Sequence, residues 1–176
     1  MIAEFQITSL QDLLEYLPTA SPDEYRSIAE DMSLSISDFK QYESWKKERY
    51  TRNCIVRTDA YELILLCWDK GHETAIHCHG GEECWVYNAQ GKIEEKNYRL
   101  EGSVPVQVHS EVLQTGEVSY MNDDLGFHKL ANLADGRSMS LHLYMNPINN
   151  CNMWSNLEQR FIPVDLKYDT LAGKPL

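Results

Sequence analysis

The chain has 176 residues, of which 43% are hydrophobic and 24% are charged, and its formal net charge is −11. This length and composition suit one globular domain, and the acidic excess argues against nucleic acid and anionic membrane surfaces as partners. No stretch approaches the roughly 18 consecutive apolar residues that a membrane-spanning helix needs. Because the net charge is negative, an anionic substrate would require a locally placed cation.

Targeting signals and cysteine usage indicate the compartment. Residues 1–6 have neither a basic start nor an apolar run, so we expect no signal peptide. The five cysteines are odd in number and scattered: Cys54, Cys67, Cys78, Cys84 and Cys151. Without an export signal, reduced thiols are expected rather than a disulfide framework. We expect a monomer in the reducing cytoplasm.

The first 49 residues have helical patterns. A weak capping pattern at residues 8–11 predicts a first helix, and a capping box at residues 21–24, with proline at the first helical position, predicts a second helix to about Met32. A third helix is predicted from about Ser35. Its aromatic side chains recur every three residues, at Phe39, Tyr42 and Trp45, and this stripe is expected to face the core.

From residue 50 onward the pattern changes to short strands. Residues 61–68 are apolar enough to form a strand that is buried on both faces. Six further strands are predicted between Gly, Asn and Asp turns, at residues 74–79, 84–88, 92–100, 104–113, 117–121 and 139–144. Such a series is typical of an antiparallel sandwich or barrel. With no linker or repeat, we predict a single, mainly β domain over residues 1–176. Residues 1–49 form a helical cap, and residues 50–176 form the barrel with a C-terminal extension.

Two histidines at the end of a predicted strand are candidate metal ligands. Successive side chains alternate along a strand, so His77 and His79 project to the same side and can share a metal ion. An isolated pair of this kind is more often only solvated or hydrogen-bonded. Five residues, however, have the spacing of a first cupin motif: Gly71, His77, His79, Cys84 and Gly91. Cys84 stands where most cupins have a glutamate ligand; Glu83 fits a shorter spacing, but the distance to Gly91 favours Cys84.

A second cupin motif follows about forty residues later. His128 and Asn132 match its end, whereas Asp123 and Leu125 replace its usual proline and glycine. The chain therefore resembles the cupins, which implies a jelly-roll-like β-barrel. The resemblance also implies one metal ion held by His77, His79 and His128.

Several segments together resemble one cupin family, the cysteine dioxygenases. They occur in the family's order at residues 50–53, 67–72, 76–79, Cys84, 122–128 and 140–144. The resemblance spans most of residues 50–151. It implies iron(II) held by three histidines without a carboxylate, L-cysteine and O₂ as substrates, and cysteine sulfinic acid as product. Three neutral imidazoles leave the ion its double charge, which suits a substrate that itself brings a thiolate.

Arg52 is the candidate clamp for the substrate carboxylate. A guanidinium can hold a carboxylate through two parallel hydrogen bonds. A surface salt bridge is the plainer alternative, and the resemblance favours the clamp. Strand alternation gives Arg52 and Arg57 opposite faces, so only one of them is expected to face the interior. Tyr50 shares the parity of Arg52 and is expected to line the pocket with it.

Ser140, His142 and Tyr144 alternate along one predicted strand and therefore share a face. The resemblance implies a hydrogen-bonded relay that directs the Tyr144 hydroxyl toward the metal, and the three side chains can form such a chain. A polar outer face is the competing interpretation, because two leucines occupy the opposite face. The resemblance further implies a thioether crosslink between Cys84 and Tyr144. We expect all four residues to act in catalysis, with Tyr144 also contacting the substrate.

Two other functions stay open at this point. The chain could oxidise another small thiol, such as 3-mercaptopropionate, or be a metal-binding cupin without catalysis. Arg52 in the clamp position favours the amino acid, and a non-catalytic cupin would leave Arg52 and the polar strand without a role. Iron follows from the resemblance, since imidazoles also bind zinc, copper and nickel.

Overall fold

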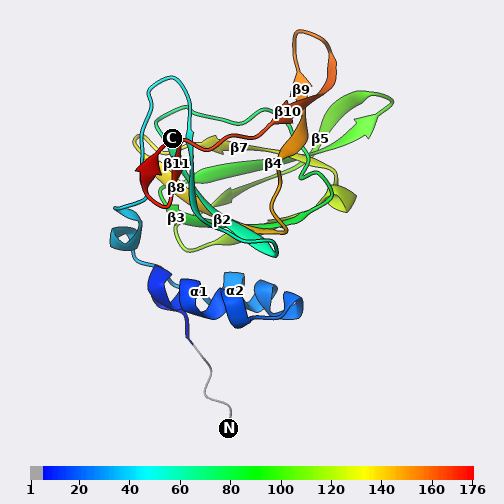
Figure 1. Ribbon diagram of the computed structural model, residues 1–176. Helices are drawn as coiled ribbons and strands as arrows, with labels where there is room; N and C mark the ends of the chain where they lie inside the picture. The colour runs from blue at the N-terminus through cyan, green and yellow to red at the C-terminus, as the bar shows by residue number, and fades with distance from the viewer. Residues whose placement is uncertain (1–5) are drawn as a thin grey trace.

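The computed structural model describes residues 6–176; residues 1–5, on which most of the signal-peptide prediction rests, lie outside the described part. Helical elements precede residue 40 and strands follow residue 50 (Figure 1). The helical elements are α1 (Leu10–Tyr16), η1 (Leu17–Thr19), η2 (Pro22–Glu24), α2 (Tyr25–Asp31), η3 (Ile36–Phe39) and, between strands, η4 (Asp123–Leu125).

The first two predicted helices are confirmed, and the third is wrong in extent. The Ser9 side chain caps α1, and the capping box of Ser21 and Glu24 is formed at the start of η2, which continues into α2. After η3 the chain is no longer helical. The reason is tertiary: the Ser44 hydroxyl donates to the Asn53 side chain (2.6 Å) and the Ser44 carbonyl accepts from the Thr51 hydroxyl (2.6 Å). These bonds turn the chain into the first strand.

The predicted mainly β fold is confirmed. The strands are β1 (Thr51–Arg57), β2 (Tyr61–Trp68), β3 (Glu83–Gln90), β4 (Ile93–Glu101), β5 (Val104–Leu113), β6 (Val118–Met121), β7 (Phe127–Asn132), β8 (Ser138–Met145), β9 (Asn150–Ser155), β10 (Arg160–Asp165), β11 (Thr170–Leu171) and β12 (Lys174–Pro175). They form a seven-stranded sheet in the order β12-β11-β1-β2-β8-β3-β6, a three-stranded sheet β5-β4-β7 and the pair β10-β9.

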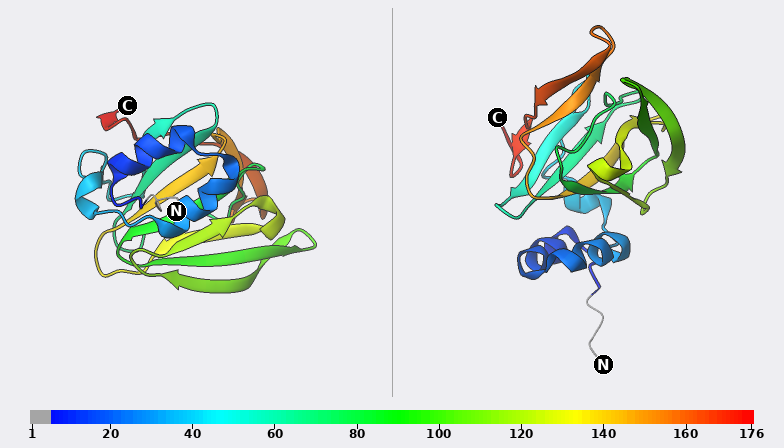
Figure 2. Two further views of the ribbon diagram at one scale, coloured as in Figure 1. Left: turned by 90° about the horizontal axis from the view of Figure 1, so that it is seen from below. Right: turned by 90° about the vertical axis from the view of Figure 1, so that its right-hand side faces the viewer.

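The sheets are not closed into one continuous ring. Residues 74–79, predicted as a strand, form only isolated bridges, in which His77 pairs with His128 of β7 and with Met153 of β9. The strand prediction is wrong there because the segment bonds to two different sheets in turn and continues no regular ladder with either: Thr74 and His77 bond to Leu130 and His128 of β7, and Ile76 and Cys78 bond to Trp154 and Asn152 of β9. The segment nevertheless connects the two smaller sheets beside the larger one (Figure 2).

Strand alternation in β2, β3 and β8 divides the core in two. On one face, Leu63, Leu65 and Leu141 pack in a cluster with the helices, which lie beneath the seven-stranded sheet in Figure 1. On the other face, Ile64 and Tyr144 belong to a second cluster between the sheets. All eight residues of β2 are buried, which confirms the strand predicted to be covered on both sides.

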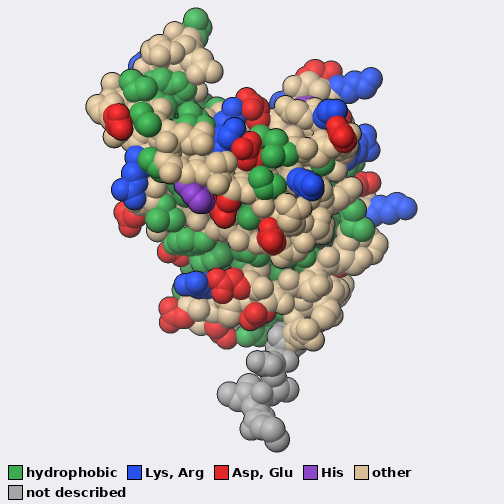
Figure 3. All heavy atoms as spheres, turned by 180° about the vertical axis from the view of Figure 1, so that it is seen from behind, with side chains coloured by type: hydrophobic (Ala, Val, Ile, Leu, Met, Phe, Trp, Pro, Cys, Tyr) green, Lys and Arg blue, Asp and Glu red, His purple; other side chains and the backbone are tan. Residues whose placement is uncertain are grey.

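The surface has mixed charge. On the face drawn in Figure 3, acidic and basic side chains are interspersed among polar and hydrophobic ones. Among the described residues, no helix is both long and apolar enough to cross a membrane.

Gly91 and Gly71 provide a matched test of packing in the first cupin motif. Both have left-handed φ angles (+80° and +79°). A Cβ atom at Gly91 would lie 2.0 Å from Oγ of Ser138, whereas one at Gly71 would meet nothing within 4 Å. Ser138 is fully buried and its hydroxyl is held by Asn132 (2.7 Å), so it cannot easily move.

We therefore expect Gly71→Ala to lower the free energy of unfolding by about 1 kcal/mol, from backbone strain alone. Gly91→Ala should lower it by about 3 kcal/mol or more, because overpacking adds to the same strain. Urea denaturation of both variants measures the difference. Equal losses would show that Ser138 gives way without cost.

Candidate active site

Three histidines converge between the sheets. The candidate ligand atoms of His77, His79 and His128 all lie within 4.8 Å of one another, and Nε2 of His77 is 3.1 Å from Nε2 of His128. Two backbone hydrogen bonds hold His77 and His128 side by side, one in each direction (2.9 and 3.0 Å). The His79 backbone N–H donates to the Asp123 carboxylate (2.7 Å), so the residue that replaces the motif proline ties the two motifs together.

The cluster fits a divalent transition metal. Both ring nitrogens of His79 are buried without a hydrogen-bond partner among the described residues. Burial, reinforced by neighbouring His128, lowers the pKa of His77 to about 3 and holds that of His79 well below its usual range. The two imidazoles are therefore neutral at pH 7, which is the form that binds metals. Buried nitrogens without partners are costly unless something satisfies them, and a metal ion would do so.

Glu95 is a functional residue that the sequence reasoning missed. Its side chain is 1% exposed, and it forms a hydrogen bond with Nδ1 of His128. Burial alone would raise the pKa of Glu95, but the bond to His128 lowers it overall. A carboxylate on Nδ1 fixes the ring and leaves Nε2 for a metal. The available signal was parity, because Glu95 shares a face of β4 with the fully buried Ile93.

A pocket lies beside the histidines. Its polar wall consists of Tyr50, Arg52, Thr74, His77, His142 and Tyr144, and apolar side chains such as Leu66, Ile148 and Leu166 complete it. Nε and Nη2 of Arg52 are buried and have no hydrogen-bond partner among residues 6–176. The Tyr50 ring stacks on Trp68, with centroids 4.7 Å apart. The pocket thus presents two guanidinium nitrogens without a partner to whatever occupies it.

The parity argument that separated Arg52 from Arg57 is wrong. The register of β1 against β2 shifts between Cys54 and Val56, and this irregularity returns Arg57 to the face of Arg52. Arg57 is nonetheless engaged elsewhere, because its guanidinium donates to Glu62 (3.0 Å), as well as to Asn149 and Tyr168. Arg52 is therefore distinguished from Arg57 by its partners rather than by its face.

Ser140 and His142 face the interior. The leucines that alternate with them, Leu141 and Leu143, pack on the opposite face with the helices. The Trp68 indole donates to the Ser140 hydroxyl (2.9 Å), and that hydroxyl lies 2.8 Å from Nε2 of His142. Nδ1 of His142 has no partner in the described chain, and its ring lies parallel to that of Tyr144 at 6.3 Å. The expected hydrogen bond between Ser140 and His142 is formed. His142 and Tyr144, by contrast, are related by stacking of their rings.

Cys84 and Tyr144 are direct cross-strand neighbours in the pairing of β3 with β8. Both are buried (0% and 3% exposed), and burial raises the pKa of each well above its usual value, so both are protonated. Directly opposed side chains have Cβ atoms roughly 4.5–5.5 Å apart, which is within reach of contact. Glu83, the alternative to Cys84, instead accepts from the Tyr120 hydroxyl (2.8 Å).

Comparison with known proteins shows the family to which the chain is similar. The family model of Cysteine dioxygenase type I matches residues 5–157. Cysteine dioxygenase type 1 from Danio rerio is 28% identical over 156 residues, covering 81% of this chain and 77% of the relative; the Homo sapiens protein is 28% identical over 135 residues (74% and 68%). An uncharacterized protein from Klebsiella pneumoniae with a double-stranded beta-helix domain has a TM-score of 0.51 at 15% identity, covering 60% of this chain and 80% of that one. This last likeness concerns the fold alone.

Glu95→Ala should weaken binding of a divalent transition metal about 10–100-fold, because His128 would lose the partner that fixes its orientation. Titration of the metal-free protein with cobalt(II), in competition with a chelator, measures the affinity. Glu94→Ala is the matched control: Glu94 neighbours Glu95 on the same strand but bonds Lys96 and Ser110, so this variant should bind like the wild type. His128→Ala should lose most of the metal. Unchanged affinity in Glu95→Ala would contradict the role of Glu95.

Proposed function

The chain belongs to the cysteine dioxygenase type I family, and we propose that it oxidises L-cysteine with O₂ to cysteine sulfinic acid on an iron(II) ion. One observation carries the proposal beyond the family. His77, a neutral member of the histidine cluster, and the two Arg52 nitrogens without a partner among the described residues border the same pocket. A substrate with both a thiol and a carboxylate matches these two features at once.

In this proposal His77, His79 and His128 hold the iron through imidazole nitrogens. When bound, iron(II) would supply the charge that favours a substrate thiolate and the redox capacity that O₂ chemistry needs. Because no carboxylate ligand reduces that charge, the ion would bind the substrate thiolate more favourably. Glu95 keeps His128 in the ligating tautomer.

The other pocket residues bind and orient the substrate. Arg52 would satisfy its buried donors with the substrate carboxylate through two parallel hydrogen bonds. Tyr50, held by its stacking on Trp68, lines the same wall, and Tyr144 presents its protonated hydroxyl near the substrate. Trp68 and Ser140 fix the His142 ring. Fixing thiol and carboxylate at two points lowers the entropic cost of a reactive geometry.

We propose that this enzyme works as a monomer, a single cupin domain, in the reducing cytoplasm, without nucleic acid or membrane partners. All five cysteines are free and buried, as expected for a protein of a reducing compartment. The net charge of −11 disfavours polyanionic surfaces.

Arg52→Ala should raise the KM for cysteine, with a loss of about 2–5 kcal/mol in binding free energy. Turnover of cysteamine, which lacks the carboxylate, should barely change. Oxygen uptake by the iron-loaded protein with cysteine, 3-mercaptopropionate and cysteamine tests both the substrate and the clamp.

The matched control compares Arg52→Lys with Arg57→Lys, the same substitution at two positions on one strand face. Only Arg52→Lys should raise the KM for cysteine, because lysine keeps the charge but loses the forked geometry. Equal effects of Arg52→Ala on cysteine and cysteamine would indicate a structural role for Arg52. Absence of cysteine oxidation by the wild type would reject the function.

We also propose that turnover joins Cys84 to Tyr144 by a thioether. The support is their direct cross-strand pairing beside the histidines. The bond forms between sulfur and a ring carbon next to the hydroxyl-bearing carbon. The thiol and ring C–H hydrogens would leave as two protons and two electrons, which would reduce one O₂, the co-substrate of the proposed reaction, to hydrogen peroxide; His77, His79 and His128 would hold the iron that supplies the redox capacity. The link would hold the phenol at a fixed place relative to the substrate.

After extended turnover with cysteine, the intact protein should therefore lose two hydrogens in mass. Peptide mapping after denaturation should show Cys84 resistant to alkylation and linked to Tyr144, while Cys67 reacts fully. Tyr144→Phe is the control, because without the phenol Cys84 should stay reactive. Complete alkylation of Cys84 in the wild type after turnover would refute the crosslink without affecting the dioxygenase proposal.

A further inference from the structure

The segment after residue 165 forms part of the pocket although it lies beyond the family match, which ends at residue 157. Leu166 lines the pocket together with Arg52. Four residues later, β11 runs parallel to β1, with Thr170 paired to Asn53. The segment therefore passes directly along the strand that carries the candidate clamp.

Asp169 brackets the backbone of Arg52. The Arg52 N–H donates to the Asp169 carboxylate (2.9 Å), and the Asp169 N–H donates to the Arg52 carbonyl (2.7 Å). On the opposite side β1 pairs with β2, where Arg52 lies across from Leu66. The backbone of Arg52 is thus held on one side by β2 and on the other by Asp169. Both backbone hydrogen bonds on the second side are made by this one residue of the C-terminal segment.

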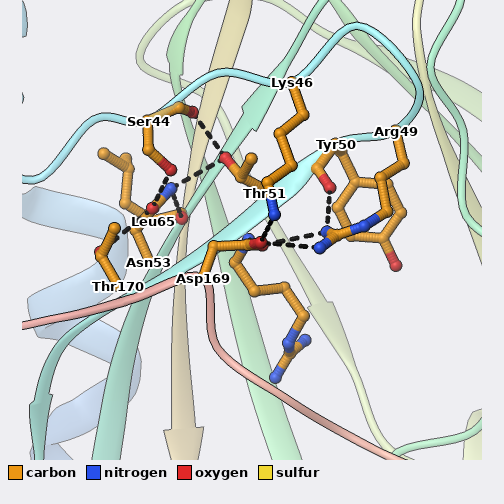
Figure 4. A network of polar contacts seen from close by, with 10 residues as sticks. Ser44, Lys46, Arg49, Tyr50, Thr51, Asn53, Leu65, Asp169 and Thr170 are labelled. Atoms are coloured by element: carbon orange, nitrogen blue, oxygen red, sulfur yellow. Dashed lines mark hydrogen bonds and ion pairs between the residues drawn. The ribbon is translucent and has the colours of Figure 1, made fainter. Parts of the chain in front are cut away.

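The Asp169 carboxylate is itself held firmly. Arg49 donates to both of its oxygens (2.9 and 2.6 Å), and Lys46 donates to one (2.7 Å), as drawn in Figure 4. Its side chain is 6% exposed, whereas those of Lys46 and Arg49 are about half exposed. Burial would raise the pKa of Asp169, but the hydrogen bonds from Arg49, Lys46 and the Arg52 backbone lower it overall, so the group stays ionised.

This arrangement positions Arg52 without neutralising it. The bonds of Asp169 go to the backbone of Arg52 and to the side chains of Lys46 and Arg49. Nε and Nη2 of Arg52 meanwhile keep no partner in the described part of the chain. An acid paired directly with this guanidinium would compete with a substrate carboxylate. Asp169, occupied by two other cations, does not.

We infer that Asp169 is a positioning residue for substrate binding, which fixes the backbone of Arg52 and leaves its guanidinium free for the substrate carboxylate. The inference rests on the proposed function of the same pocket. A clamp of this kind must hold its place to within about 0.5 Å, and misplacement of a binding group by 1 Å can cost on the order of 100-fold in rate. The C-terminal segment is then part of the active site rather than an appendage.

The test compares two variants of the same segment by oxygen uptake of the iron-loaded protein. Asp169→Ala removes the carboxylate that accepts from the Arg52 N–H and keeps only the backbone bond to the Arg52 carbonyl. This variant should raise the KM for cysteine roughly tenfold or more, with kcat little changed. Thr170→Val removes only the adjacent hydrogen bond to Asn53 (3.1 Å) and should leave the KM for cysteine unchanged. Thermal melts of both variants control for folding; if Asp169→Ala does not fold, Asp169→Asn replaces it.

A double-mutant cycle shows whether Asp169 acts through Arg52. In an Arg52→Ala background, Asp169→Ala should raise the KM for cysteine no further. A full additional rise in that background, or the same KM rise in Thr170→Val, would overturn the positioning role while leaving cysteine oxidation by the wild type intact. If the wild type does not oxidise cysteine, both the proposed function and this inference fall.

Discussion

The mutual pair of backbone hydrogen bonds between His77 and His128 is the interaction on which the candidate site depends. It joins a loop segment to β7 and brings together imidazoles 51 residues apart in sequence. Asp123 adds a second tie by accepting from the His79 backbone. Because both ties are made by the backbone or to it, they leave Nε2 of His77, Nε2 of His128 and both ring nitrogens of His79 available to a metal ion. A metal site needs side chains in this condition, placed but unsatisfied.

The interior between the sheets contains many polar side chains, and burying them would be costly without hydrogen-bond partners. Each buried group there is satisfied in a distinct way: Glu95 by His128, Ser140 by Trp68, and Glu62 by Arg57 and Tyr168. Most of the exceptions lie together. Five of the eight buried side-chain atoms that lack a partner among the described residues belong to Arg52, His79 and His142, at the pocket and the histidine cluster. Unsatisfied buried donors and acceptors are costly, so their concentration marks the place where ligands complete the structure.

The two faces of the largest sheet have different roles: one packs against the helices, and the other carries residues of the candidate site. Its outer face is covered by α1 and α2, which bury the leucines of β2 and β8 and stabilise the fold. Its inner face can then carry Ser140, His142 and Tyr144, because stability no longer requires apolar side chains at those positions. The helical cap thus has a functional consequence without contacting the site. It also decides against the interpretation of this polar strand face as solvent-exposed.

Local patterns in the sequence determined the features that depend on near neighbours. The capping box predicted the start of the second helix, and uninterrupted apolarity predicted a strand buried on both faces; both are confirmed. The resemblance of residues 50–151 predicted the family, which the match over residues 5–157 confirms. The spacing of His77 and His79 predicted that they could share a ligand, and the structure brings them together with His128. These predictions hold because helix caps, apolar runs and motif spacing are properties of short segments.

Only the tertiary structure decided the features that depend on distant residues. The register shift between Cys54 and Val56 overturned the face assigned to Arg57, because strand parity survives only while pairing is regular. Glu95 meets His128 from another strand, and Asp169 reaches Arg52 across more than a hundred residues of chain. No local pattern encodes such contacts. They follow from which strands pair and in which register, and that is settled by the packing of the whole chain.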